Sequence, residues 1–293
     1  MLEIERLENI TNQLGEGPLW DVQSNCLFWV DSLKGEIYRM VENGEINSWS
    51  MPSMIGSLAI ITENLALVAL ETGFHFFDFT TGVLGAIIDP EADVPETRFN
   101  DGKTDRAGNF IAGSMGRKIR DRPLACLYRM KPDLSLEVLE PDVIVANGPC
   151  FSPDGSTFYF NDGRRRILAY DYDPSGPLTN KRTLFEGAEH NTGSDGATVD
   201  TDGNLWVALT GSSEIGCISP TGEILQRIPM PVRLPSSVMF GGTNLNELYV
   251  TSISNSGNRI SEEEGAGGLF RLTGLNATGI AEKRFVPERP YDA

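Results

Sequence analysis

Four short segments of the chain place a carboxylate or an amide directly before a glycine, in the sequences EGPLWD, NDGKTD, NGPCFSPDG and DGATVDTDG. The residues concerned are Glu16, Asp101, Asn147 and Asp195. Each lies 9 to 11 residues before the first apolar residue of a β-type segment. Side chains with these oxygen atoms can bind a hard cation or act as a general base, provided that the fold brings them together.

The rest of the sequence predicts an all-β fold. Short β-branched and aromatic runs, closed by Gly, Asp, Asn or Pro, outnumber windows with helical periodicity. Six copies of a strand-turn-strand module begin their apolar runs near Leu27, Leu65, Phe110, Phe158, Leu205 and Leu248. Their spacing of 38 to 48 residues is typical of four-stranded propeller blades. We therefore expect a six-bladed β-propeller in a single domain, residues 1–293, with LEIERLEN pairing into the last blade.

The register of the modules predicts a metal site. Corresponding residues of different blades converge on the central axis of a propeller, so Glu16, Asn147 and Asp195 are expected to meet there. Two carboxylates and an amide in a narrow channel repel one another unless a cation joins them. Such ligands suit Ca²⁺, Mg²⁺ or Mn²⁺. The alternative interpretation is that these residue pairs only form turns.

Composition limits the partners and the location. The chain has 293 residues and a formal net charge of -17, which opposes binding to nucleic acid or to an anionic membrane surface. Neither a basic signal-peptide region nor an apolar stretch long enough for a membrane span is recognisable. The cysteines are far apart and read as reduced thiols: Cys26, Cys126, Cys150 and Cys217. We expect a cytoplasmic protein, either a monomer or a homodimer.

The motifs LGEGPLW, RFNDGK, NGPCFSPDG, SDG with DTDGNLWVA, and FGGTNLNELYVTS occur in this order along nearly the whole chain. Together they resemble the gluconolactonase, regucalcin (senescence marker protein) and luciferin-regenerating enzyme family. The resemblance implies a six-bladed propeller with one divalent metal at its centre. It also implies a carboxylic ester hydrolase whose substrate is a sugar lactone.

The resemblance assigns roles to particular residues. Glu16, Asn147 and Asp195 match the family's metal ligands, and Asp195 would also be the general base. The substrate-contacting Arg and Asn of the family's RxND motif match Arg98 and Asn100. The expected ion is calcium, with magnesium, manganese or zinc as alternatives. Hydrolysis would then proceed without a covalent intermediate, because the metal polarises the ester carbonyl and Asp195 accepts a proton from water.

Two basic clusters stand out in this acidic chain: Arg117, Lys118, Arg120 and Arg122 in the first, and Arg164, Arg165 and Arg166 in the second. The first cluster lies in the loop GRKIRDRP, where some family members have a substrate-contacting acid that the resemblance does not assign to a residue here. We therefore expect Arg117 and Arg120 to contact the substrate and hypothesise that they receive an acidic group on it. The alternative for both clusters is a solvated loop.

Other functions remain open at this point. The alternatives are a calcium-binding regulatory protein like regucalcin, a propeller scaffold that binds proteins, and a hydrolase of the paraoxonase or organophosphatase kind. A Ser-His-Asp mechanism is a weaker hypothesis, because the sequence has no GxSxG motif and its two histidines are poorly placed. His75 lies in the strand-like FHFFDF, whereas His190 lies five residues before Asp195 and could reach the mouth of a pocket.

Overall fold

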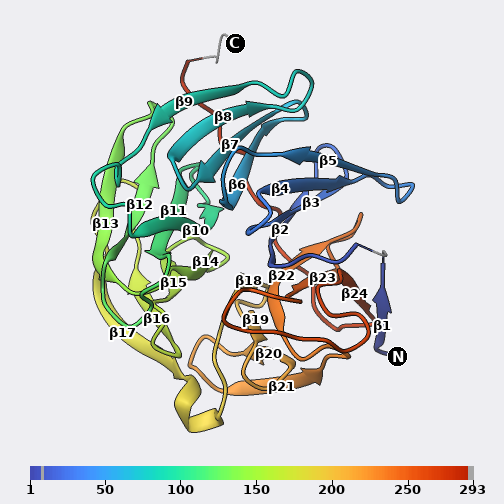
Figure 1. Cartoon of the computed structure of the whole chain (residues 1–293). Helices are drawn as coiled ribbons and strands as arrows, with labels where there is room; N and C mark the ends of the chain where they lie inside the picture. Colours follow the sequence, from blue (N-terminus) through green and yellow to red (C-terminus); the bar gives the residue numbers. More distant parts are fainter. Residues whose placement is uncertain (8–9, 290–293) are drawn as a thin grey trace.

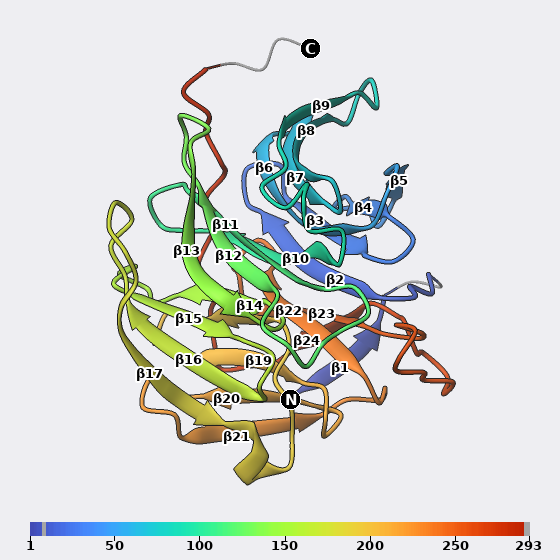
Figure 2. The ribbon, with the colours of Figure 1, turned by 60° about the vertical axis from the view of Figure 1, so that its left-hand side comes forward.

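The computed structural model describes residues 1–7 and 10–289. Within these residues, 24 strands form six four-stranded antiparallel sheets arranged radially around a channel (Figure 1, Figure 2). The described residues include one short 3-10 helix, η1 (Gly187–His190). None of their helices is long and apolar enough to cross a membrane. The predicted all-β, six-bladed β-propeller is confirmed.

The first three blades follow one another along the chain. Blade 1 contains β2 (Gly15–Asp21), β3 (Cys26–Asp31), β4 (Glu36–Met40) and β5 (Ile46–Ser50). Blade 2 contains β6 (Ile55–Thr62), β7 (Leu65–Leu70), β8 (Gly73–Asp78) and β9 (Leu84–Ile88). Blade 3 contains β10 (Thr97–Thr104), β11 (Phe110–Gly116), β12 (Ala125–Met130) and β13 (Leu136–Val143). In each blade the first strand is the innermost.

The remaining blades complete the ring. Blade 4 contains β14 (Asn147–Phe151), β15 (Thr157–Asn161), β16 (Arg166–Asp171) and β17 (Thr179–Glu186). Blade 5 contains β18 (Ala197–Val199), β19 (Leu205–Leu209), β20 (Glu214–Ile218) and β21 (Ile224–Pro229). Blade 6 contains β22 (Pro235–Gly241), β23 (Glu247–Ser252), β24 (Phe270–Thr273) and the N-terminal β1 (Glu3–Arg6).

The N-terminus closes the ring. Strand β1 pairs antiparallel with β24 and joins the last three strands of the chain as the outermost strand of blade 6, in the register Glu3 to Thr273 and Arg6 to Phe270. The pairing predicted for the N-terminal run is therefore confirmed as far as it falls on described residues; Glu8 and Asn9 lie outside them. This pairing covers the outer edge of β24 and ties the N-terminal strand to the last strands of the chain, so each end of the chain stabilises the other.

Local sequence fixes the strand boundaries. The turns DRAGN, SPDG and DTDG connect the first and second strands of blades 3, 4 and 5, as the turn chemistry predicts. In two of them an aspartate, Asp105 or Asp200, accepts hydrogen bonds from backbone N–H groups of the turn. The glycines Gly108, Gly155 and Gly203 have φ angles of +97°, +74° and +85°. These turns place the following apolar run in the second strand of each blade.

The apolar core lies between the blades. The buried side chains of two adjacent sheets interdigitate, and six large clusters correspond to the six contacts between neighbouring blades. Between blades 1 and 2, for example, Phe28 packs with Ile55 and Phe77. One blade alone would leave these faces exposed, so burial stabilises the ring as a whole.

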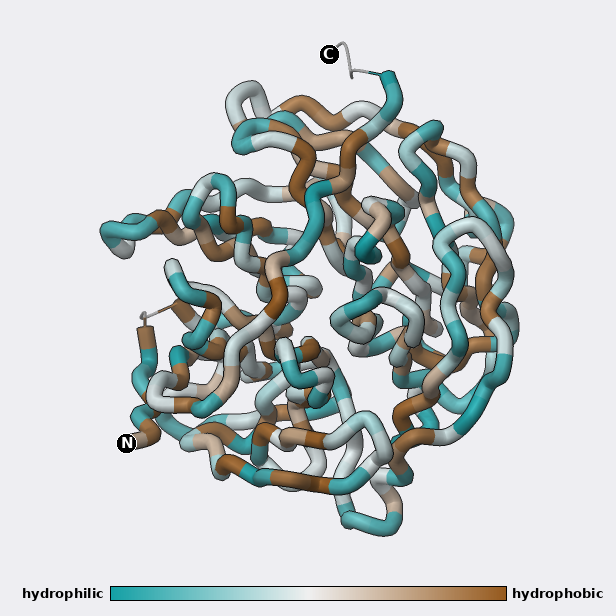
Figure 3. Tube along the Cα trace, turned by 180° about the vertical axis from the view of Figure 1, so that it is seen from behind, coloured by the Kyte–Doolittle hydropathy of each residue, from teal (hydrophilic) through white to brown (hydrophobic). Residues whose placement is uncertain are grey.

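The C-terminal segment crosses the back of the propeller (Figure 3). Arg284 pairs with Asp21 at the end of β2, and the Phe285 side chain is fully buried in the core cluster between blades 2 and 3. Glu282 approaches Lys103, with 3.9 Å between Nζ and Oε1. The segment thus lies against the end of the channel where the innermost strands finish. The opposite end, where those strands begin, stays available for a ligand.

Candidate active site

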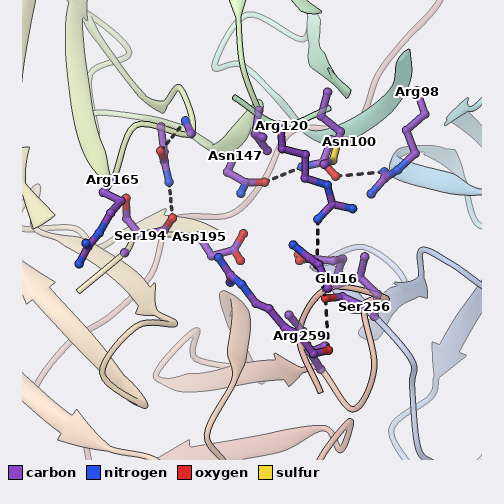
Figure 4. Close-up of a pocket in the computed structure, with 18 residues that line it drawn as sticks. Glu16, Arg98, Asn100, Arg120, Asn147, Arg165, Ser194, Asp195, Ser256 and Arg259 are labelled. Carbon is purple, nitrogen blue, oxygen red and sulfur yellow. Dashed lines mark hydrogen bonds between the residues drawn. The ribbon is translucent and has the colours of Figure 1, made fainter. Parts of the chain in front are cut away.

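A cavity of about 220 Å³ lies at the end of the channel where the innermost strands begin (Figure 4). Its size suits a small molecule more than a polymer. Most of its lining is polar: Glu16, Arg98, Asn100, Arg120, Asn147, Asn161, Arg165, Ser194, Asp195, Ser256, Asn258 and Arg259. These residues come from blades and loops distant in sequence, which is what a radial repeat produces at its axis.

The three side chains of the predicted metal site all line this cavity. Glu16 is on β2, Asn147 begins β14, and Asp195 lies two residues before β18. Their role as metal ligands stays a prediction. The glycine after each of them is structurally necessary: Gly17 and Gly148 have φ angles of +52° and +57°, and a Cβ at Gly196 would lie 1.9 Å from the Ser237 hydroxyl.

A β-bulge accompanies the polar residue on two of these strands. The pairing register shifts between Glu16 and Leu19 on β2, and between Asn147 and Cys150 on β14. Strand β10 has the same irregularity between Phe99 and Gly102. A bulge adds a residue on one strand and redirects its side chain, and here it follows the residue that lines the cavity. The pairs at Glu16, Asp101 and Asn147 are therefore bulge sequences on innermost strands, whereas the pair at Asp195 lies just before β18, whose pairing has no register shift.

Burial dominates the electrostatics of the two carboxylates. It raises the pKa of Glu16 well above its usual range, and the negative charges of Asp195 and Asp101 raise it further. Burial also raises the pKa of Asp195 to about 7, against the lowering effect of the Arg259 charge. Two carboxylates that disfavour each other's ionised form are held together in a site largely removed from water.

Arg98 and Asn100 are connected to the predicted metal ligands. Arg98 donates from Nη1 to Asn100 Oδ1 at 3.1 Å, and Asn100 donates from Nδ2 to Asn147 Oδ1 at 2.6 Å. Asp101 has another function: its carboxylate accepts the backbone N–H of Gly148 at 2.9 Å and so fixes the bulge that carries Asn147. Burial lowers the pKa of Arg98 to about 10, and the nearby Arg120 lowers it as well.

The donor set fits a divalent cation. The described residues contain no cluster of three or more His, Cys, Asp or Glu side chains suited to a metal, so the candidate set is two carboxylates and one amide. Their oxygen atoms are the ligands that calcium and magnesium prefer. The Asn147 carbonyl keeps a second lone pair beside its hydrogen bond to Asn100. A cation would also relieve the repulsion that raises the pKa values of Glu16 and Asp195.

The structure separates the two arginines predicted to contact substrate. Arg120 lines the cavity, where Nη1 donates to Asn258 Oδ1 at 3.0 Å. Arg117 is exposed, forms an ion pair with Glu71, and lines a neighbouring groove with Lys118. The common cavity therefore holds only Arg120 of this pair. A substrate contact by Arg117 stays a prediction without support from its position.

Two further arginines line the cavity, and sequence reasoning assigned neither of them to the site. Arg165 belongs to the second basic cluster, and its Nε donates to the Thr192 carbonyl at 2.9 Å. Arg259 comes from the long loop between β23 and β24, and no sequence motif marked it.

Neither histidine lines the cavity. His75 is half-buried on β8, with its Nδ1 3.1 Å from the carbonyl oxygen of Gly73. His190 ends η1 and stacks on Phe185, with 4.9 Å between the ring centroids. Among the described residues, a triad built on histidine therefore has no place in this cavity.

Fold and site together define a class: a six-bladed β-propeller with a small polar cavity, rich in oxygen donors and arginine, at one end of its channel. Comparison with known proteins gives the family. The chain belongs to the SMP-30/Gluconolactonase/LRE-like family, whose model matches residues 14–254. The family resemblance of the sequence motifs is confirmed.

Relatives carry different functional names. The chain is 34% identical to L-arabinolactonase of Azospirillum brasilense, over 95% of this chain and 94% of that protein. It is 33% identical to 6-deoxy-6-sulfogluconolactonase of Pseudomonas putida, over 93% of this chain and 94% of that protein. A solved structure of regucalcin from Agrobacterium tumefaciens, described as a calcium-binding protein, matches with a TM-score of 0.88 and 27% identity, over 96% of each chain.

Proposed function

We propose that this protein is a divalent-metal-dependent lactonase, which hydrolyses a sugar lactone to the aldonic acid. The observation that carries the proposal is the shared cavity of two buried carboxylates and an amide, with Arg98 and Asn100 beside them. Binding of an ion alone has no need for a buried guanidinium aimed at the same space. Membership in a family that includes an arabinolactonase supports the reaction class.

Glu16, Asn147 and Asp195 would hold the ion. When bound, a divalent cation polarises an ester carbonyl and stabilises negative charge on its oxygen. Calcium is the first candidate, because of the oxygen donors and the calcium-binding relative. Magnesium, manganese and zinc remain alternatives.

The chain's own groups position the substrate and move the proton. A bound cation would favour the ionised form of Asp195, and this carboxylate would accept the proton of the attacking water. Thr210 Oγ1 lies 3.4 Å from Asp195 Oδ2 and orients the carboxylate. Arg98 uses Nη1 to bind the Phe99 and Asn100 oxygens, which leaves other N–H groups of its guanidinium for a lactone oxygen. The reaction needs no covalent intermediate.

A chelator experiment tests this proposal. The purified protein is treated with EDTA, dialysed, and assayed with a pH indicator on neutral and anionic aldonolactones before and after addition of calcium. We expect activity to disappear with the metal and return with it. The Asp195→Asn and Glu16→Gln variants should remain inactive after calcium addition, whereas Asp202→Asn, at an exposed turn, should behave as the wild type. Full activity in EDTA would refute the metal dependence.

A second function is supported by the calcium-binding relative: a regulatory protein that binds calcium without lactonase activity. The same experiment separates the two. Calcium binding by calorimetry, combined with no hydrolysis of any aldonolactone, would favour the regulatory function. A cytoplasmic location is part of our proposal in either case, supported by four cysteines that are all free thiols.

A further inference from the structure

Two loops from opposite sides of the ring meet over the cavity. Residues 117–124 connect β11 and β12 of blade 3, and residues 253–269 connect β23 and β24 of blade 6. Blades 3 and 6 face each other across a ring of six. The loops touch where Arg120 donates to Asn258 at 3.0 Å. The predicted metal ligands lie on the innermost strands or, for Asp195, directly before one, so these loops form a roof on the other side of the cavity.

The roof presents two guanidinium groups to the cavity, those of Arg120 and Arg259 (Figure 4). Among the described residues, no carboxylate oxygen lies within 4.0 Å of a guanidinium nitrogen of either arginine, which is the limit for an ion pair. Burial and the positive charge of Arg259 lower the pKa of Arg120, against the raising effect of the negative charge of Asp195, which forms no ion pair with either arginine. Like charges this close, without a paired carboxylate, are typical of an anion-binding site.

Charge balance in the cavity supports the same conclusion. Four arginines and two carboxylates line it, which leaves a formal charge of +2 in a protein whose net charge is -17. A divalent cation bound by Glu16 and Asp195 would add two further positive charges. A neutral sugar lactone compensates none of this charge, whereas a lactone with an anionic substituent compensates part of it.

We propose that Arg120 and Arg259 bind an anionic substituent at the end of the lactone remote from its ester carbonyl. The substrate class is therefore a sugar lactone that bears a phosphate, sulfonate or carboxylate group. This inference rests on the proposed lactonase function, since it takes the ester carbonyl to lie near Glu16, Asn147 and Asp195. The two guanidiniums would each donate hydrogen bonds to oxygen atoms of the anion.

Two other uses of these arginines give different results in an experiment. Arg259 could serve only to neutralise Asp195, whose pKa its charge lowers. In that case its loss would affect neutral and anionic lactones equally. The arginines could instead hold the carboxylate of the product. Their loss would then weaken product inhibition with a neutral lactone and leave the selectivity between lactones unchanged.

The test compares D-glucono-1,5-lactone with its 6-phosphate in the calcium-loaded protein. The variants are Arg120→Gln, Arg259→Gln and the double variant. The matched control is Arg122→Gln, an exposed arginine of the same loop that does not line the cavity. We expect the double variant to lose about 100-fold in kcat/KM on the phosphorylated lactone, because each lost charge-assisted contact reduces affinity by about tenfold or more. On the neutral lactone the change should stay within about threefold. Equal losses on both lactones would refute the proposal.

A binding measurement without chemistry provides a second readout. Calorimetry should show that the wild type binds D-glucitol 6-phosphate but not D-glucitol, its uncharged counterpart. The double variant should bind neither compound. Lactones of D-glucaric acid and 6-sulfogluconic acid then distinguish carboxylate and sulfonate from phosphate. Wild-type protein that binds glucitol 6-phosphate but hydrolyses no lactone would refute the lactonase and keep the anion site. Hydrolysis of neutral lactones with no preference for any anionic one would refute the anion site and keep the lactonase.

Unfolding temperatures distinguish a loss of binding caused by the missing guanidinium groups from one caused by unfolding of the variant. Arg259 is exposed, so Arg259→Gln should unfold within about 2 °C of the wild type. If the double variant unfolds during purification, the single Arg259→Gln variant still tests the proposal. It should lose about tenfold in kcat/KM on the phosphorylated lactone, and an unchanged value would overturn the assignment of Arg259.

Discussion

Asp195 allows a quantitative prediction about the metal-free protein. Its carboxyl group has a pKa of about 7 in the folded state, because burial penalises the ionised form. In the unfolded chain the value is about 3.9. Between these two values the folded state binds a proton that the unfolded state has lost, so the free energy of unfolding falls as pH rises from about 4 to 7. Three pH units correspond to about 4 kcal/mol.

Replacing Asp195 by Asn removes this penalty while keeping the size of the side chain. In EDTA at pH 8 we expect Asp195→Asn to unfold on the order of 6 °C above the wild type, from about 4 kcal/mol and the unfolding entropy of a chain of this length. At pH 5 most of the difference should vanish, because the wild-type carboxyl is then protonated. Saturating calcium should raise the wild-type unfolding temperature and leave the variant nearly unchanged.

The assay is thermal unfolding followed by circular dichroism, with EDTA and with calcium, at pH 5, 6.5 and 8. Asp202→Asn controls for the general effect of removing one negative charge from an acidic protein. In EDTA, the wild type should lose more stability between pH 5 and pH 8 than Asp195→Asn does. An equal or smaller loss would refute the raised pKa of Asp195. The carboxylates would then not be destabilised by burial, and the case for a cation between them would lose its electrostatic basis.

Three other substitutions, the first with a matched control, test the scaffold. Gly148→Ala should lower calcium affinity in calorimetry and the free energy of unfolding by about 1–3 kcal/mol, because the position has a φ of +57° and the new Cβ would lie 2.7 Å from the Asp195 carbonyl oxygen. Gly44→Ala, with a φ of +84° and open space around the Cβ, isolates the backbone strain and should leave calcium affinity intact. Arg129→Met should lower the free energy of unfolding by about 3–5 kcal/mol in urea without changing KM, because the buried guanidinium binds two backbone carbonyls and a carboxylate away from the cavity. Phe285→Ala should cost about 3–5 kcal/mol in the same assay, because the fully buried ring fills the core between blades 2 and 3.

The repeated part of the structure could be predicted from the sequence. Each blade repeats the same alternation and turn chemistry, so the spacing of the apolar runs predicted six blades, and the turns predicted where the second strands begin. Because equivalent positions of a radial repeat meet at its axis, register alone also brought Glu16, Asn147 and Asp195 to one cavity. It could not show that Asp101, at nearly the same position, turns its carboxylate to the Gly148 backbone.

The sequence pointed to Arg120 but not to the rest of the roof of the cavity, for a physical reason. Arg259 and Arg120 reach the cavity only because two loops of different length, from blades on opposite sides of the ring, extend far enough to touch. No periodicity constrains such loops, so position along the chain does not tell a roof arginine from a solvated one. Arg117 and Arg120 show this most clearly, since they are three residues apart and only one of them lines the cavity.

The innermost strands and the roof loops contribute differently to the proposed specificity. The residues predicted to act on the ester group come from the innermost strands, where bulges and close strand packing restrict what can change. The residues proposed to bind the rest of the substrate come from loops, where insertions and substitutions cost little stability. Family membership therefore constrains the chemistry more than the substrate. Among members that share the strand residues, selectivity between neutral and anionic lactones should follow the charge of the two roof loops, which exchange of residues 117–124 and 253–269 between relatives would test directly.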